Sequence, residues 1–324
     1  MNPPVLFAPG ASRALGTRVA EALEVPLAPF ELRTFEDGEH KGRPLASVRG
    51  AHCFLLATLH GQAGRSVNDA LVETLFAAGT LRDAGAAQVT LVAPYLCYAR
   101  KDARTQVRDP VNSRQLAQLC EAMGVGCVVA CEVHSRAAFD NAFRIPTVHL
   151  DATALFVGAL HGALEGERVC VVSPDAGGLK RAERLRSALE TALGRPVGRA
   201  LMEKRRSGGE VSGDFLAGEV GGHAVVIVDD LISGGTTLAR TALASRAHGA
   251  KRVLAAITHG PFSAAVAAKL VELPLEEILL TDTAGRCAPP VSGPGTQPCA
   301  LRYLDCAPLL ATAIAHLHAR TGPG

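Results

Sequence analysis

Two adjacent carboxylates precede a glycine-rich turn in the segment VVIVDDLISGGTTL, residues 225–238. Carboxylates repel phosphate, but they accept hydrogen bonds from hydroxyls such as the vicinal pair of a ribose. The turn that follows is rich in glycine and hydroxyl side chains, and backbone N–H groups at a strand-to-helix turn favour a phosphate. Asp229 and Asp230 ahead of this turn therefore predict a site for a ribose 5-phosphate.

The turn itself is the predicted phosphate cradle. Its glycines would let the backbone approach the ligand, and its hydroxyls would add donors. The alternative is an ordinary strand, turn and capped helix. The predicted phosphate-binding residues are Ser233, Gly234, Gly235, Thr236 and Thr237.

Two segments in the N-terminal half carry side chains suited to a nucleotide. TFEDGEH, residues 34–40, offers an aromatic face and acids that could accept hydrogen bonds from the exocyclic amine of adenine. APYLCYARKDAR, residues 93–104, follows a predicted strand with basic residues that could clamp a triphosphate, arginine by bidentate contacts. Taken alone, the first is a commonplace turn and the second a solvated basic loop.

Apolar, β-rich runs alternate with Ala- and Leu-rich segments of helical spacing along the whole chain. This alternation predicts an α/β fold with parallel sheets covered on both faces. The predicted strands are residues 4–8, 53–58, 88–93, 127–130, 168–172, 224–228 and 252–258. The predicted helices are residues 12–23, 68–84, 113–123, 179–193, 236–248, 264–270 and 309–320.

The strand–helix pattern runs once to about residue 150 and restarts near Arg168, which predicts two doubly wound domains, 1–150 and 151–305. The remaining residues, 306–324, would form a helix that packs back on the first domain. Glycines and charges predict a mobile loop over residues 202–215, and a Pro/Gly-rich loop is expected at 288–298.

Composition argues against several classes of protein. The net charge is only +2, aromatic residues make up 4% and tryptophan is absent, so no nucleic-acid partner is expected. No apolar run reaches the roughly 20 residues of a membrane span. The nine scattered cysteines predict reduced, buried thiols and, with no recognisable signal peptide, a cytoplasmic location.

The segment 225–238 resembles the phosphoribosyl-pyrophosphate loop shared by type I phosphoribosyltransferases and ribose-phosphate diphosphokinases. Many of the diphosphokinases carry Thr-Gly-Gly-Thr where this chain has Gly234 to Thr237, an order closer to a variant seen in some phosphoribosyltransferases. The length of the loop is preserved, so phosphate binding is expected to survive.

Four further stretches resemble the diphosphokinases in particular. TFEDGEH is similar to their adenine-binding motif, and APYLCYARKDAR to a phosphate-side motif in which Lys101 replaces the usual glutamine. VACEVHSR resembles a segment that carries a magnesium-binding histidine, and VVSPDAGGLKRAERL resembles one that carries a magnesium-binding aspartate. MEKRR resembles a basic catalytic loop. Because a phosphoribosyltransferase needs only one such domain, the resemblance favours a diphosphokinase with two related domains and the active site between them.

The resemblance implies transfer of the diphosphoryl group of Mg-ATP to ribose 5-phosphate by a homo-oligomer built from dimers, such as a hexamer, in which a neighbouring subunit supplies the adenine contacts. Lys204 and Arg206 would be the catalytic residues, and His134 and Asp175 would bind Mg²⁺. The alternatives are a regulatory homologue that binds nucleotide or sugar phosphate without turnover, and a phosphoribosyltransferase. The ATP-binding residues implied are Phe35, Asp37, Glu39, Arg100, Lys101, Asp102 and Arg104.

Overall fold

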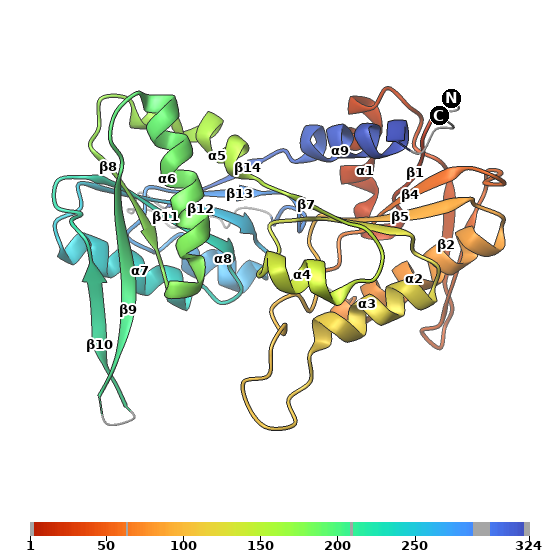
Figure 1. The fold of residues 1–324 in the computed structure, drawn as a ribbon, viewed down its shortest axis with the longest axis horizontal. Coiled ribbons are helices and arrows are strands. Elements are labelled where there is room, and N and C mark those ends of the chain that lie inside the picture. Colours follow the sequence, from red (N-terminus) through yellow and green to blue (C-terminus); the bar gives the residue numbers. More distant parts are fainter. Residues whose placement is uncertain (1–2, 63, 208–209, 288–298, 321–324) are drawn as a thin grey trace. The chain divides into compact units, whose positions relative to one another are not determined.

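The computed structural model describes residues 3–62, 64–207, 210–287 and 299–320, with the backbone alone for the described part of 204–214. The chain divides into two compact units. Unit 1 comprises Met1–Leu150, Thr283–Gly285 and Cys306–Gly324, and unit 2 comprises Asp151–Asp282 and Arg286–Asp305. Each unit has its own sheet and its own helices (Figure 1).

Unit 1 contains a parallel sheet whose strands neighbour one another in chain order. Its described strands are β1 (Val5–Phe7), β4 (His52–Leu56), β5 (Gln88–Ala93), β6 (Cys127–Cys131) and β7 (Thr147–Leu150). A separate antiparallel hairpin is formed by β2 (Phe30–Thr34) and β3 (His40–Pro44).

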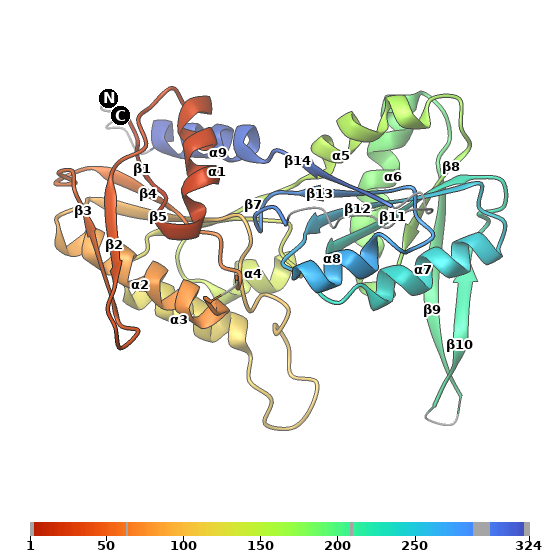
Figure 2. The same cartoon turned by 180° about the vertical axis from the view of Figure 1, so that it is seen from behind.

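Helices cover both faces of the unit 1 sheet, as Figures 1 and 2 show from opposite sides. One face carries α2 (Val67–Asp83), α3 (Asn112–Ala122) and α4 (Arg136–Ala142). The other carries α1 (Arg13–Ala22), which follows the 3-10 turn η1 (Gly10–Ser12), and the C-terminal α9 (Ala307–Arg320). Because α9 packs against α1, the end of the chain belongs to unit 1.

Unit 2 has a larger sheet whose strand order is β10-β9-β8-β11-β12-β13-β14 within the described residues. All neighbouring pairs are parallel except the β9–β10 hairpin. The strands are β8 (Val169–Ser173), β9 (Gly198–Ser207), β10 (Glu210–Ala217), β11 (Ala224–Leu231), β12 (Arg252–His259), β13 (Glu277–Thr281) and β14 (Ala300–Leu304). After β8 the chain adds β9 and β10 on one side of that strand, and β11 then pairs with its other side.

Strand β11 shows why this sheet needs helices on both faces. Val225 and Ile227 pack into one core cluster and Val226 and Val228 into another, because successive side chains of a strand point to opposite faces. Figure 2 shows the two layers on either side of the sheet. The helical elements are α5 (Thr153–Leu160), η2 (Gly162–Leu164), η3 (Ala176–Gly178), α6 (Leu179–Leu193), α7 (Thr236–Ala247) and α8 (Ala264–Leu270).

The predicted α/β class is confirmed, but several details differ from expectation. The described residues of 202–215, expected as a loop, belong to strands β9 and β10, where backbone pairing outweighs the loop-like composition. Cys287 is only partly buried, whereas the other eight cysteines are buried as expected. The predicted loop at 288–298 lies outside the described residues. None of the helices within the described ranges is long and apolar enough to cross a membrane.

Candidate functional site

The two predicted diol-binding acids lie at the carboxyl end of β11, next to the point where the strand order of unit 2 reverses. Open α/β sheets bind ligands at such points, because the connections leave a crevice beyond the strand ends. Strand β11 runs past the predicted end at residue 228, and Asp229 still lies in register with Ile257 of β12. Pairing in the sheet therefore fixes the backbone of both acids.

Both carboxylates are largely buried and face one cation. The side chains of Asp229 and Asp230 are 23% and 8% exposed. The guanidinium of Arg181, on α6, lies 3.4 Å from Oδ1 of Asp229 and 3.6 Å from Oδ2 of Asp230. Arg181 was not among the predicted site residues, although it stands in the segment VVSPDAGGLKRAERL. Its position, as a cation in the first turn of the helix after β8, could have indicated its role.

Burial is the main cause of a pKa shift at Asp229. Burial raises the pKa of Asp229 to about 7, and a hydrogen bond to Asp230 and the charge of Asp230 add to the shift. The charge of Arg181 and the amide of Asp230, which donates to Oδ1 of Asp229 at 2.9 Å, oppose it. Hydrogen bonds from neutral hydroxyls would stabilise the ionised form of such a carboxylate pair.

The glycine turn after β11 is exposed and requires glycine at one position. Gly235 precedes α7 in the left-handed conformation, with φ of 79°, and an added Cβ would lie 2.7 Å from Cδ2 of Leu270. Gly234 has open space around it. The N-cap residue of α7 is Gly235 itself, so the helix has no N-cap side chain that bonds to its first turn. Ser233, Thr236 and Thr237 are exposed beside these N–H groups, an arrangement that suits an anion.

The two predicted magnesium ligands belong to different units. Asp175, in unit 2, is exposed and caps η3, where its Oδ1 accepts from the Gly178 amide at 3.0 Å. His134, in unit 1, is exposed just before Ser135, the N-cap of α4. Throughout the described part of the chain, no group of three or more His, Cys, Asp or Glu side chains is placed to hold a metal ion.

The basic loop that follows β5 in unit 1 is organised by one of its own acids. Oδ2 of Asp109 accepts from Nζ of Lys101 at 2.6 Å and from the hydroxyl of Thr105 at 2.7 Å, with the amides of Thr105 and Gln106 each at 3.1 Å. The hydrogen bond from Lys101 is the main reason that the pKa of Asp109 lies well below its usual range. Lys101 is thus ion-paired within its loop.

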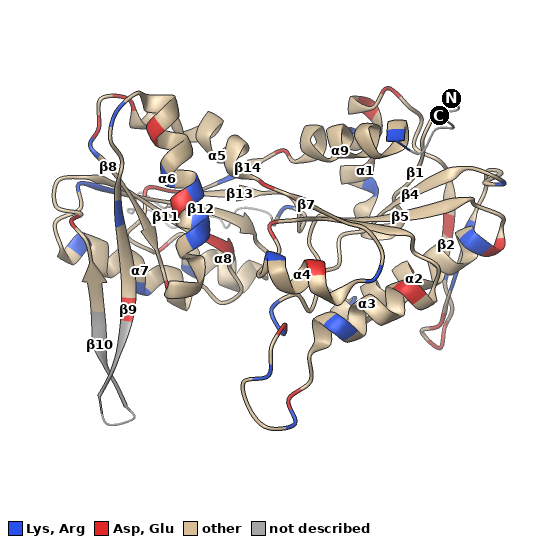
Figure 3. Cartoon of the chain, in the orientation of Figure 1, with Lys and Arg blue, Asp and Glu red and all other residues tan. Residues whose placement is uncertain are grey.

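The other predicted phosphate-side residues lie on the same loop. Arg100 and Arg104 are exposed and Asp102 is half-buried, and Nε of Arg104 donates to the backbone carbonyl of Asp109 at 3.2 Å. Figure 3 shows basic and acidic residues interspersed along this loop. The arginines are therefore available to an anion at the surface, while the loop takes its shape from Asp109.

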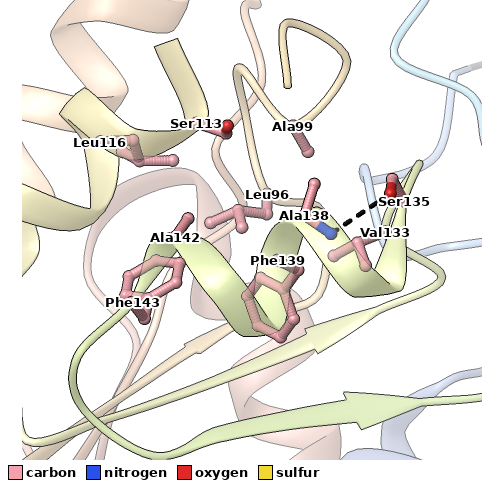
Figure 4. A pocket seen from close by; sticks show the side chains of 10 residues that line it. All are labelled: Leu96, Ala99, Ser113, Leu116, Val133, Ser135, Ala138, Phe139, Ala142 and Phe143. Carbon is pink, nitrogen blue, oxygen red and sulfur yellow. Dashed lines mark hydrogen bonds between the residues drawn. The ribbon is translucent and has the colours of Figure 1, made fainter. Parts of the chain in front are cut away.

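An apolar cavity lies beneath the start of this loop (Figure 4). Leu96 and Ala99 line it from the loop, and residues of α3, α4 and the segments flanking α4 complete its wall. Its volume of about 10 Å³ is at the lower limit for a single water molecule and far too small for a nucleotide. The cavity is therefore a packing defect under the loop.

The predicted adenine motif forms the turn of the β2–β3 hairpin. The amide of Phe35 donates to the carbonyl of Glu39 at 2.7 Å, and Oδ1 of Asp37 accepts from the amide of Glu39 at 3.0 Å. The ring of Phe35 is 40% exposed, and the guanidinium of Arg33 lies 5.1 Å from its centroid. The turn is thus ordered locally and presents an aromatic face to solvent.

The two predicted catalytic residues, Lys204 and Arg206, lie on β9. The backbone of both pairs with β10, opposite Asp214 and Val211 respectively. Their side chains lie outside the described part of the chain.

Comparison with known proteins covers most of the chain. Residues 4–124 match the N-terminal domain of ribose phosphate pyrophosphokinase, and residues 125–272 match the phosphoribosyl transferase domain. The ribose-phosphate pyrophosphokinase of Bradyrhizobium diazoefficiens is 34% identical over 86% of this chain and 84% of its own length. That of Caulobacter vibrioides is 33% identical over 95% of each chain.

A solved structure is similar over nearly the whole length. The crystal structure of phosphoribosylpyrophosphate synthetase from Mycobacterium smegmatis superimposes with a TM-score of 0.86 and 29% sequence identity. The similarity spans 98% of this chain and 100% of that one.

Proposed function

The chain belongs to the ribose-phosphate pyrophosphokinase family of transferases, and on that premise we propose that it transfers the β,γ-diphosphoryl group of ATP to the 1-hydroxyl of ribose 5-phosphate. The hydroxyl oxygen attacks the β-phosphorus, the bond from that phosphorus to the oxygen of the α-phosphate breaks, and the hydroxyl proton is released. The products are phosphoribosyl pyrophosphate and AMP.

The observation that carries this proposal is the juxtaposition of paired, buried acids and an uncapped, glycine-rich helix N-terminus after β11. A ribose 5-phosphate has a diol at one end and a phosphate at the other, so it matches both halves of this site. Asp229 and Asp230 would accept from the diol, and the residues from Ser233 to Thr237 would hold the phosphate.

The ATP side of the proposal rests on unit 1. The exposed ring of Phe35, with Asp37 and Glu39 on the same turn, would meet adenine. Arg100, Lys101 and Arg104 would bind the phosphates, and Asp102 on the same loop is assigned to ATP by resemblance. Positioning and neutralisation of phosphate charge dominate catalysis of such transfers. Lys204 and Arg206 are assigned to the transferring group by resemblance.

Magnesium would be held by His134 and Asp175. Their exposure and the sparse set of ligands fit an ion that keeps several waters and takes its other ligands from substrate phosphates. When bound, the ion neutralises phosphate charge. We also infer a homo-oligomer built from dimers, since the family supplies adenine contacts from a neighbouring subunit; light scattering after size exclusion tests this assembly.

The decisive experiment is to incubate the protein with ATP, ribose 5-phosphate and Mg²⁺ and to measure AMP and phosphoribosyl pyrophosphate together. Lys204→Ala should lower kcat by about 10²-fold, the usual loss for one preorganised electrostatic group. Lys251→Ala is the matched control, because Lys251 pairs with Glu167 at the surface of unit 2. Binding of both substrates without AMP would instead support the regulatory homologue.

A further inference from the structure

Arg181 has no role in the reaction as described so far, yet it is the cation that contacts both acids. It lies in the first turn of α6, immediately beyond η3, and its side chain is only 11% exposed. Strands β8 and β11 are parallel neighbours, with Val172 in register with Ile227. The helix that leaves β8 therefore starts beside the end of β11, which brings Arg181 to acids almost fifty residues away.

The contacts of Arg181 straddle the acid pair. Nη1 lies 3.4 Å from Oδ1 of Asp229 and Nη2 lies 3.6 Å from Oδ2 of Asp230, so the two terminal nitrogens of the guanidinium address different carboxylates. A bidentate pair with one acid would engage both oxygens of that acid at shorter range. The straddling arrangement places one guanidinium beside both carboxylates, so a single cation addresses the two acids together.

We propose that Arg181 is a positioning residue for the ribose diol, which holds the carboxylates of Asp229 and Asp230 side by side so that each presents an oxygen to one hydroxyl. This inference rests on the proposed function. Two buried carboxylates repel each other, and without a cation between them they would separate or take up a proton. In either case the spacing that matches vicinal hydroxyls would be lost.

If Arg181 had only a structural role, its removal would have different effects on stability and on substrate binding. If the guanidinium only offsets buried charge, its removal would lower stability and affect both substrates alike. If it positions the acids, the loss concentrates on ribose 5-phosphate and depends on pH. The sign follows from the charge of Arg181, which lowers the pKa of Asp229. Its removal raises that pKa further, so the variant binds worst near neutrality and recovers at alkaline pH.

The test compares Arg181→Met, Arg181→Lys and Arg184→Met with the wild type. Arg184 lies on the same helix and pairs with Asp151 at 2.9 Å, which makes it the control for loss of an α6 ion pair. For Arg181→Met we expect the KM for ribose 5-phosphate to rise about tenfold near pH 7, from loss of a charge-assisted network. The KM for ATP should change less than about twofold, and the defect should shrink towards about pH 9.

Arg181→Lys should restore part of the affinity, and Arg184→Met should leave both KM values unchanged. An Arg181→Met variant whose KM rises equally for both substrates, or whose defect is the same at every pH, overturns the positioning role. Calorimetric titration with ribose 5-phosphate gives a readout independent of turnover. A wild type that binds ribose 5-phosphate but makes no AMP overturns the proposed function alone; equal binding by Arg181→Met and wild type near pH 7 overturns the role of Arg181 alone.

Discussion

The acid pair at the carboxyl end of β11 and the basic loop after β5 both lie where a parallel strand ends, but they are held in different ways. Asp229 meets Arg181, a residue 48 positions away on another element. Asp109 meets Lys101 and Thr105, eight and four positions away on its own loop. The first arrangement depends on the tertiary structure of unit 2, and the second on local chain geometry.

The same side chain consequently behaves in opposite ways at the two places. Burial raises the pKa of Asp229, whereas hydrogen bonds from Lys101 and Thr105 lower that of Asp109. The two side chains are almost equally exposed, at 23% for Asp229 and 24% for Asp109, so their partners make the difference. Asp229 lies beside a second acid, whereas Asp109 accepts four hydrogen bonds that order its own loop. The proposed sugar side is thus held by contacts between elements, and the proposed nucleotide side by contacts within one loop.

The largest effect is expected from Asp229→Asn. The folded-state pKa of Asp229 is raised to about 7, so its ionisation costs stability above that pH, and the cost disappears as pH falls towards the unfolded value. The variant should therefore be more stable than wild type by about 1–3 kcal/mol near pH 8, with little difference near pH 4. It should also lose about 10²-fold in kcat/KM for ribose 5-phosphate.

Thermal denaturation of the two proteins across this pH range measures the effect, and Asp109→Asn is the matched control. Its folded-state pKa is lowered, so its contribution to stability is present above the unfolded pKa and is lost in acid. Asp109→Asn should thus be less stable than wild type near pH 8. Equal shifts of the same sign in both variants would remove the contrast between the two regions.

The glycine turn offers the next largest effect. Gly235→Ala places a side chain at φ of 79° and against Leu270, so we expect a loss of stability of about 1–2 kcal/mol and weaker binding of ribose 5-phosphate. Gly234→Ala is the control, because its Cβ would enter open space. Denaturant unfolding and calorimetric titration measure the two effects. If both variants behaved alike, the turn would not be rigidly preformed.

A smaller effect should separate the two roles open to Lys101. If Lys101 and Asp109 act as a tether for the loop, Lys101→Gln and Asp109→Asn should each raise the KM for ATP about two- to fivefold, and the double variant should be no worse than either. If Lys101 binds phosphate directly, Asp109→Asn should instead lower the KM, because it releases the cation. Steady-state kinetics of all four proteins resolve this double-mutant cycle.

The smallest effect concerns burial inside unit 1. His52 donates or accepts a hydrogen bond with Thr90 at 2.8 Å, and burial, aided by the charge of His318, lowers its pKa to about 4. Wild type should lose stability as pH falls from about 6.5 towards 4, because the unfolded state takes up the proton first. His52→Gln should reduce this loss by a few degrees in Tm at most, roughly the scale of 1 kcal/mol.

Circular dichroism melts at several pH values measure this change. His316→Gln, an exposed position on α9, is the control. If the pH dependence of Tm were the same in His52→Gln and in wild type, burial in unit 1 would not shift the pKa of His52 as it shifts that of Asp229 in unit 2.

Much of the fold was accessible from sequence because its signals are local. The apolar run and glycine turn around Asp229 predicted strand, turn and helix, and α6 and α8 have the bounds expected. The β9–β10 hairpin was not predicted, since charged and glycine-rich residues are paired there by backbone bonds that carry no apolar signature. Short strands such as β13 were missed because β-propensity depends on neighbours that the sequence does not identify.

The sequence by itself determined which side chains stand at strand ends: an acid pair before a glycine turn, and cations after an N-terminal strand. Strand and turn formation depend on periodicity and on residues a few positions apart, so they leave a readable trace. Only the tertiary structure decided the partners and charge states of those side chains. Arg181 reaches the acids because β8 and β11 are neighbours in the sheet, and the raised pKa of Asp229 arises from burial by elements distant in sequence.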